Sequence, residues 1–224
     1  PTLDGAENYI KTLDHGGYFE VTALSGEDLK KTELYHANAE RRRAQAAFAD
    51  YGAYLDSLAM KATIRPFEPL YLQRIAQLTN KSNQFNLTTL RCSEEDIRAM
   101  STDPAWLCLY GKLEDRFGDN GVVTVVAGQQ EGALLHLRLW LMSCRVLKRG
   151  MEDAMMDAVV ADAAARGVKT ICGYYYPTAK NAMVKEFYAE MGFARIKADE
   201  NGNTVWNLDV AAYTARHPHM EILR

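Results

Sequence analysis

The sequence predicts an α/β (α+β) fold in which a mixed, splayed β-sheet is flanked by helices. Three strand-like runs, at 106–113, 122–127 and 134–144, follow one another with only short turns between them, which predicts an antiparallel meander. A helical pattern at 150–166 and a strand at 170–174 come next. A helical crossover makes the strands on either side of it parallel. We therefore expect the last meander strand and strand 170–174 to splay apart and to form a ligand crevice.

The rest of the chain supplies the elements around this sheet. The alternation ATIRPF predicts a first strand at 61–66, which Pro66 ends. Ser93 and the acidic residues after it mark the start of a helix. The other predicted elements are helices at 68–79 and 179–191 and a final hairpin of strands 193–197 and 204–208, turned at Asn201 and Gly202.

An N-terminal helical extension is predicted before the sheet. Residues 1–24 suit a lead-in with one short helix. Ser25 and Asp28 fit a capping box, and the apolar stripe that follows predicts a helical hairpin or one broken helix, with Gly52 as the break. The basic run at 41–43 has the composition of a nucleic-acid patch, but acidic neighbours favour a solvated helix face.

Composition narrows the classes of function. With 224 residues, 48% of them apolar, the chain is long enough to bury a proper core. Its 26 basic and 29 acidic residues give a net charge of −3, which disfavours a polynucleotide partner or an anionic membrane surface. No apolar run is long enough to span a bilayer. Four dispersed cysteines without a C-x-x-C pair predict reduced thiols in a cytoplasmic protein.

A basic loop lies where the last meander strand meets its helix. Backbone N–H groups at a helix start lack intrahelical partners, so this position suits a phosphate, and three basic side chains add charge. The chain offers no comparable pattern for a metal ion. The residues of the predicted phosphate cradle are Arg145, Val146, Lys148, Arg149, Gly150 and Met151.

The element order and the ending NAMVKEFYAEMGF resemble the GNAT N-acyltransferase superfamily from about Met60 to Asp209. That resemblance implies an acyl-CoA or another phosphopantetheine thioester in the crevice. It also implies that Asn181 contacts the pantetheine arm and that Tyr188 protonates the departing thiolate, although an amphipathic core tyrosine is the plainer interpretation of Tyr188. The chain departs from the family's loop pattern at Leu147 and Glu152, and a first-turn carboxylate competes with a phosphate for the same amides.

Two further candidates lie on the last meander strand. Cys144 stands at its C-terminal end beside Arg145 and a helix start, which favours a thiolate nucleophile or covalent acyl station, while a small apolar role remains the alternative. His136 is a candidate base, with a satisfied or exposed strand histidine as the alternative. Simple alternation places His136, Trp140 and Cys144 on one face of the strand.

The polar run at 80–89 occupies the position at which GNAT proteins shape the acceptor site. Its candidate substrate-binding residues are Asn83, Gln84, Asn86 and Thr88. The alternative is a loop whose side chains satisfy its own backbone.

Three segments, RIAQLTNKSNQFNLTT, LMSCRVLKRGMEDAM and GYYYPTAKN, together resemble the C-terminal half of FkbH-like proteins of HAD superfamily subfamily IIIC. This resemblance covers essentially the whole chain. It implies an upstream HAD domain, which would hold any Mg²⁺, an acyl carrier protein as partner, and glyceryl transfer for polyketide biosynthesis.

These inferences divide the chain into a helical lead-in at 1–59, a GNAT-like acyltransferase domain at 60–212 and a tail at 213–224. The predicted function is transfer of a small acyl group by way of acyl-CoA or an acyl carrier protein. The alternative is a non-catalytic GNAT-fold module that recruits a carrier protein to the HAD domain. Glu152 and the altered loop favour that alternative.

Overall fold

A computed structural model describes residues 26–216 and 218–224, with the backbone alone for residues 26–35. The chain divides into two compact units, residues 1–43 and residues 44–224. Helix α2 (Gly26–Gln45) contains the basic run, in which Arg43 pairs with Glu40 at 2.8 Å on an exposed face. The lead-in predicted at 1–24 lies outside the described residues.

The second unit starts with a short helix and not with the predicted break at Gly52. Helix α3 (Tyr51–Ser57) contains Gly52 in its first turn, and the interruption falls before it, at 46–50. Asp50 caps α3 by accepting a hydrogen bond from the Ala53 N–H at 2.6 Å. The capping carboxylate therefore fixes the helix start one residue before the sequence pattern placed a break.

One nine-stranded sheet forms the centre of the second unit. Its order is β7-β8-β6-β5-β4-β3-β1-β9, with β2 paired to β5 alongside this path. Strand β9 was not predicted, and it pairs in parallel with β1 at the sheet edge. The strands are β1 (Lys61–Pro66), β2 (Phe85–Asn86), β3 (Trp106–Asp115), β4 (Gly118–Glu131), β5 (Leu134–Met142), β6 (Thr170–Tyr175), β7 (Ala194–Ala198), β8 (Thr204–Asp209) and β9 (Glu221–Leu223).

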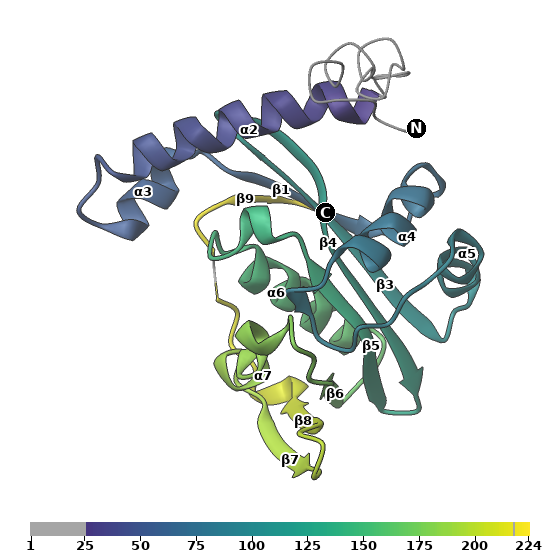
Figure 1. Cartoon of the computed structure of the whole chain (residues 1–224). Helices are drawn as coiled ribbons and strands as arrows, with labels where there is room; N and C mark the ends of the chain where they lie inside the picture. The colour runs from purple at the N-terminus through teal and green to yellow at the C-terminus, as the bar shows by residue number, and fades with distance from the viewer. Residues whose placement is uncertain (1–25, 217) are drawn as a thin grey trace, which may run out of the picture. The chain divides into compact units, whose positions relative to one another are not determined.

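Helices pack on both faces of this sheet and give two separate cores (Figure 1). On one face lies α6 (Met151–Ala165), with a large cluster that includes Trp140 and Tyr188. On the other face, α4 (Leu72–Lys81) and α5 (Glu94–Thr102) cover β3, β4 and the end of β5. The predicted cap of α5 is confirmed, because Ser93 and Asp96 form a reciprocal capping box.

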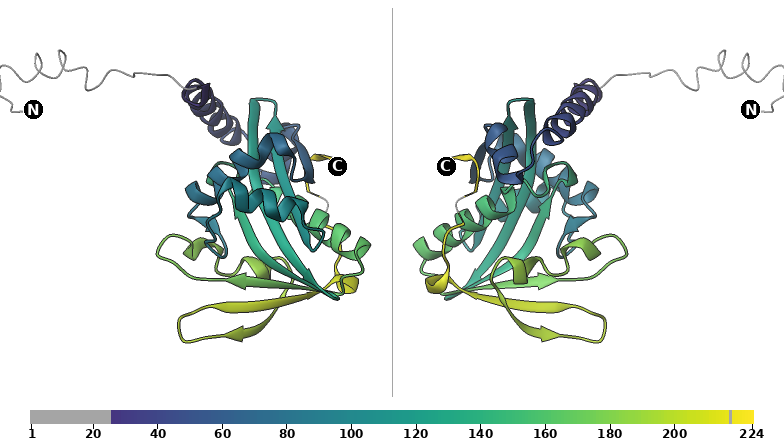
Figure 2. Two further views of the ribbon diagram at one scale, coloured as in Figure 1. Left: turned by 90° about the vertical axis from the view of Figure 1, so that its right-hand side faces the viewer. Right: turned by 90° about the vertical axis from the view of Figure 1, so that its left-hand side faces the viewer.

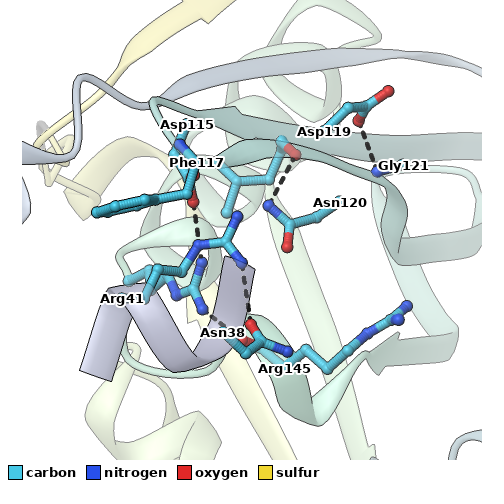
Figure 3. A network of polar contacts seen from close by, with 10 residues as sticks. Asn38, Arg41, Asp115, Phe117, Asp119, Asn120, Gly121 and Arg145 are labelled. Carbon is cyan, nitrogen blue, oxygen red and sulfur yellow. Dashed lines mark hydrogen bonds and ion pairs between the residues drawn. The ribbon is translucent and has the colours of Figure 1, made fainter. Parts of the chain in front are cut away.

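The β3–β4 hairpin is longer than predicted and irregular near its turn. Its pairing shifts register between Gly111 and Glu114. The Asn120 side-chain amide donates to the Leu113 carbonyl at 3.3 Å, and the Asp119 carboxylate accepts from the Gly121 N–H at 2.6 Å (Figure 3). These side-chain contacts compensate for ladder bonds that the bulges remove.

The predicted parallel pairing and splay are confirmed. Strands β5 and β6 pair only from Leu134–Thr170 to Leu137–Gly173, although both continue beyond those residues. Beyond the last pair, β6 follows β8 in an antiparallel ladder. In Figure 2 the yellow-green strands β7 and β8 accordingly fan away from the teal strands of the meander.

The predicted alternation along β5 is wrong beyond Arg138, because a β-bulge lies at that residue. Ala127 of β4 pairs with Leu139 and Gly128 pairs with Leu137, so Arg138 is an extra residue in β5. The bulge reverses the side-chain alternation beyond it. Trp140 therefore packs in the α6 core with Leu137, and not on the face of His136 as simple counting placed it.

The helix predicted at 179–191 is also interrupted. It consists of a 3₁₀ turn, η4 (Ala182–Val184), and one turn of α-helix, α7 (Phe187–Glu190). Asn181 and Glu186 precede these turns with non-helical backbone angles. Asn181 takes this conformation while its side chain binds the segment before it, which removes the first turn of the expected helix.

Candidate active site

The splay between β5 and β6 is spanned by the chain itself. Residues 85–88, which we call the bridging segment, include β2 and lie between the two strands. The Leu87 N–H donates to the Trp140 carbonyl of β5 at 3.0 Å, and the Leu87 carbonyl accepts from the Tyr176 N–H, just after β6, at 2.9 Å. The Thr88 hydroxyl donates to the Arg138 carbonyl at 2.7 Å. The Trp140 and Arg138 carbonyls at the splayed edge of β5 and the Tyr176 N–H are thus paired within the protein.

Asn181 fixes the bridging segment. Its side chain is fully buried, and its amide nitrogen donates to the carbonyls of Asn86 at 3.0 Å and Tyr176 at 2.9 Å. Its amide oxygen accepts from the Thr178 N–H at 2.7 Å. The residue predicted to contact a pantetheine arm therefore binds the segment that fills the arm's expected position.

Tyr188 lies beneath the same splay with an unsatisfied hydroxyl. The side chain is 1% exposed, and its hydroxyl has no hydrogen-bond partner among the described residues. The backbone of Tyr174 is near enough to act on that hydroxyl electrostatically, but not in hydrogen-bonding geometry. Burial raises the pKa of the Tyr188 phenol well above its ordinary value, which keeps it protonated.

The ring of Tyr188 packs closely against Gly173 of β6. A Cβ atom added at Gly173 would lie 2.4 Å from that ring, so only glycine permits this approach. Phe187 is the centre of the neighbouring aromatic cluster, with ring centroids 4.9 Å from Trp140 and 5.0 Å from Phe85 of the bridging segment. The Trp140 indole N–H is a second buried donor without a partner among the described residues.

The loop before α6 has the curvature of an anion cradle, but a carboxylate of the chain fills it. Lys148 and Gly150 have left-handed backbone angles, with φ of 63° and 82°. The Lys148 N–H donates to the Glu152 carboxylate at 2.9 Å, and the backbone amides of Gly150 and Glu152 also stabilise that carboxylate. Because Glu152 occupies the amides at the helix start, the loop does not fit a pyrophosphate as it stands.

Two of the three basic side chains of the loop are also bound within the protein. Arg149 forms a buried ion pair with Asp115 at 3.2 Å and donates to the Arg145 carbonyl at 2.8 Å. The Arg145 side chain reaches Ser143 at 3.3 Å, while Lys148 is exposed. Two other residues predicted for the cradle, Val146 and Met151, are buried in the α6 core.

The contribution of Glu152 to the stability of the protein is expected to depend on pH. Burial, the largest effect, raises the pKa of its carboxyl above the ordinary value of 4.5, against the lowering effect of the amides. Between pH 4.5 and the raised pKa of the folded state, the folded protein therefore keeps a proton on Glu152 that the unfolded chain has lost. The contribution of Glu152 to stability accordingly falls as the pH rises through that range. Glu152→Gln removes the ionisation and keeps an acceptor for Lys148. We expect the variant's stability relative to wild type to increase from about pH 4 to about pH 7 in urea unfolding. A relative stability that falls with rising pH would contradict this assignment.

Cys144 is exposed in a 3₁₀ turn, η3 (Cys144–Val146), directly after β5. The other three cysteines are buried. Burial raises the pKa of the Cys92 thiol to about 11 and that of Cys108 to about 12, so both remain thiols at neutral pH. Cys144 is thus the one cysteine at the surface, at the end of the splayed strand.

His136 lies on the opposite face of the sheet from Tyr188, within a polar cluster that the sequence pattern did not reveal. Its Nδ1 atom is 2.7 Å from the Tyr174 hydroxyl of β6. Its Nε2 atom is 3.8 Å from the Glu131 carboxylate of β4. Alternation along β6 could have placed Tyr174 on this face, but the register that joins it to His136 depends on pairing between distant segments.

The polar run at 80–89 is largely satisfied by its own contacts. Asn83 accepts from the Arg91 guanidinium, and Asn86 is fully buried, donating to the Ser82 carbonyl at 3.3 Å. Gln84 is exposed. Of the predicted acceptor-site residues, Asn86 and Thr88 belong to the bridging segment, while Asn83 and Gln84 lie just before it.

Two other kinds of feature are absent from the described residues. They contain no group of three or more histidine, cysteine, aspartate or glutamate side chains that could hold a metal ion. Within residues 26–216 and 218–224, no helix is both long and apolar enough to cross a membrane.

The chain matches no protein-family model and no curated protein. Solved structures do match. The ribosomal-protein-S18-alanine N-acetyltransferase of Escherichia coli aligns over 68% of this chain and 96% of its own, with 15% identity and a TM-score of 0.51. The GNAT domain of PAT from S. lividans aligns over 65% and 89%, with 17% identity and a TM-score of 0.50.

A GNAT-family acetyltransferase from Streptococcus pneumoniae aligns over 66% of this chain and 98% of its own, with 15% identity and a TM-score of 0.52. At these identities the likeness concerns the fold alone. It agrees with the mixed sheet, the splay after Leu137 and Gly173, and the helix packed on each face. The chain has the GNAT N-acyltransferase fold.

Proposed function

We propose that this chain transfers an acyl group from a phosphopantetheine thioester, with the reacting thioester in the splay between β5 and β6. The buried Tyr188 hydroxyl is the observation that carries the proposal. A buried hydroxyl without a partner costs about 1–3 kcal/mol, so its position under the splay calls for a polar group that enters from outside. A thiolate leaving group is such a partner, and a protonated phenol can supply its proton.

The donor that we propose is an arm borne by an acyl carrier protein. Free acyl-CoA brings a pyrophosphate to the start of α6, where Glu152 already holds the amides and Arg149 is paired with Asp115. Both features oppose a diphosphate. In the FkbH-like setting, the acyl group would be a glyceryl unit prepared by an upstream HAD domain.

In this proposal the bridging segment moves aside when the arm enters. The arm needs the β5 edge that Leu87 and Thr88 occupy through the carbonyls of Trp140 and Arg138. Asn181, released from Asn86, then becomes available to the pantetheine amides. The bridging segment thus closes the splay in the free protein, and the arm replaces it.

Tyr188→Phe tests this function because it separates catalysis from folding. Removing an unpartnered buried hydroxyl should leave stability unchanged or raise it by up to about 1 kcal/mol. Removing a general acid should slow thiol release about 100-fold or more. Thiol release from an S-acetyl-phosphopantetheinyl carrier protein, with ethanolamine present as the acyl acceptor and a thiol reagent as the detector, and urea unfolding provide the two readouts.

The control for Tyr188→Phe is Tyr51→Phe, which removes a tyrosine hydroxyl that donates to the Lys148 carbonyl at 2.8 Å on the surface. This variant should release thiol at the wild-type rate. Equal rates for Tyr188→Phe and wild type would reject Tyr188 as the acid.

A second candidate function is a non-catalytic module that docks a carrier protein. The observations that favour it are the bridged splay and the carboxylate in the cradle. Calorimetry with the phosphopantetheinylated carrier, combined with the thiol assay, separates the two. Carrier binding without thiol release supports docking, and thiol release supports transfer.

A further inference from the structure

A second cluster of ionisable side chains lies beside the splay, on the face opposite Tyr188. It joins three strands: Glu131 of β4, His136 and Arg138 of β5, and Tyr174 of β6. The Tyr174 hydroxyl is 2.7 Å from His136 Nδ1, and the two rings stack with centroids 6.0 Å apart. The His136 side chain is only 14% exposed. A phenol, an imidazole and a carboxylate thus form a continuous row.

The neighbours of His136 define the direction of its hydrogen bonds. The Glu131 carboxylate, 3.8 Å from Nε2, favours a proton on that nitrogen. In the neutral ring Nδ1 is then the acceptor, so the Tyr174 hydroxyl donates to it. The Arg138 guanidinium lies 5.5 Å above the Tyr174 ring and 3.6 Å from Glu131. Burial, the largest effect, raises the pKa of the Tyr174 phenol and keeps it protonated at rest, while the Arg138 cation acts in the opposite direction and stabilises negative charge that develops on the phenol.

The nearby thiol does not fit the role of nucleophile or base in this cluster. Cys172 is paired with His136 in the parallel register of β5 and β6, but it is buried. Burial, its largest effect, raises the pKa of the Cys172 thiol, against the lowering effect of Arg138. A buried thiol is a poor nucleophile, which leaves the Tyr174 hydroxyl as the reactive end of the row.

The position of Tyr174 connects this row to the splay. Leu137 and Gly173 form the last pair between β5 and β6, and Tyr174 is the next residue of β6. The Tyr188 ring packs on Gly173 from the α6 face, whereas Tyr174 and His136 point to the other face. Two phenols therefore flank the opening of the splay from opposite faces of the sheet.

We propose that Tyr174 is the proton acceptor for the acyl acceptor, with His136 and Glu131 as positioning residues behind it. This inference rests on the proposed acyl transfer. The acceptor is an alcohol or a neutral amine, whose oxygen or nitrogen attacks the thioester carbon. Its proton passes to the Tyr174 oxygen while the Tyr174 proton passes to His136 Nδ1.

The charges balance when the tetrahedral adduct collapses. The carbon–sulfur bond breaks, and Tyr188 donates its proton to the departing sulfur. The imidazolium, paired with Glu131, then gives up its proton to solvent, and the Tyr188 phenolate regains one from solvent. The net reaction converts acceptor and thioester into acylated acceptor and free thiol, with no other reactant.

The Tyr174→Phe variant tests the role of Tyr174 as proton acceptor. The probe acceptor is ethanolamine, and the acyl donor is an S-acetyl-phosphopantetheinyl carrier protein. We expect acetyl transfer, measured by mass spectrometry of the product, to fall about 100-fold or more, with carrier affinity unchanged. The matched control is Tyr71→Phe, a tyrosine outside the splay whose ring packs on Tyr110 with centroids 4.9 Å apart. This control should keep the wild-type rate.

The pH dependence of the transfer rate shows whether His136 positions Tyr174 and takes up its proton or only supports the structure. His136→Gln keeps an acceptor for Tyr174 but cannot take up a proton, so it should lower the rate and abolish the acid limb of the pH–rate profile. Glu131, Arg138, Cys172 and Tyr174 are the charged or titratable groups that face His136 from the three strands. An acid limb that persists in His136→Gln overturns the positioning role.

Different results would overturn the proton relay through Tyr174 and His136, which we call the relay, and the proposed acyl transfer. A wild-type protein that releases thiol, together with a Tyr174→Phe variant that transfers at the same rate, overturns the relay alone. A wild-type protein that releases no thiol from any carrier thioester overturns both proposals.

Discussion

Replacing Asn181 with alanine is expected to lower the free energy of unfolding by about 3 kcal/mol or more. The substitution removes the side-chain partner of three backbone groups: the Asn86 carbonyl in a buried contact, and the Tyr176 carbonyl and the Thr178 N–H in partly buried contacts. Each unsatisfied group costs about 1–3 kcal/mol, and the costs are not fully additive because the groups share one site. Urea unfolding measures the change.

Two further variants sharpen the Asn181 prediction. Asn181→Asp keeps the acceptor for Thr178 but places a carboxylate against two carbonyl oxygens, so it should be as destabilising as alanine. Asn203→Ala is the control, because its amide donates to the exposed Asp199 at 2.8 Å, and it should cost less than about 1 kcal/mol. An Asn181→Ala protein within about 1 kcal/mol of wild type would reject the role of Asn181 in fixing the bridging segment.

Arg149→Met is expected to destabilise the protein by about 3–5 kcal/mol. The side chains of Arg149 and Asp115 are 10% and 0% exposed, and the substitution breaks their 3.2 Å ion pair at a site shielded from water. The pair links the loop before α6 to the end of β3, so we expect the loop to loosen.

The double variant Arg149→Met with Asp115→Leu should recover part of that loss, because it removes both charges. Arg98→Met is the surface control, since its ion pair with Glu94 is about half exposed and its loss should cost less than about 0.5 kcal/mol. Equal midpoints of urea unfolding for Arg149→Met and Arg98→Met would contradict a structural role for Arg149.

The sequence predicted the fold well where hydrophobic periodicity and element order decide it. The meander, the crossover helix and the parallel pair around the splay all follow from patterns within single segments. The pattern did not reveal β9, because three residues carry little periodicity and their pairing with β1 joins distant parts of the chain. The Arg138 bulge was missed for a similar reason, since a bulge shows only in the register of two strands.

The candidate site was predicted in its parts but not in its arrangement. Asn181 and Tyr188 both lie at the splay, as the resemblance to GNAT proteins implied. The sequence did not indicate that a segment 95 residues earlier, at Asn86, would be the partner of Asn181. Glu152 could be recognised as a competitor for the helix-start amides, because a carboxylate in the first turn of a helix is attracted to its N-terminus. The Tyr174–His136 contact depends on strand register and was not predicted.

We propose above all that the splay between β5 and β6 is the thioester site and that the bridging segment closes it in the free protein. Hydrogen exchange at the Leu87 amide tests it most directly, because that amide donates to Trp140 only while the segment is in place. The probe is S-acetonyl-phosphopantetheine, an unreactive mimic of the thioester arm. We predict a protected Leu87 amide in the free protein and exchange about tenfold faster when the mimic is saturating. Unchanged or slower exchange at Leu87 with the mimic bound, or no binding of the mimic, would contradict the claim.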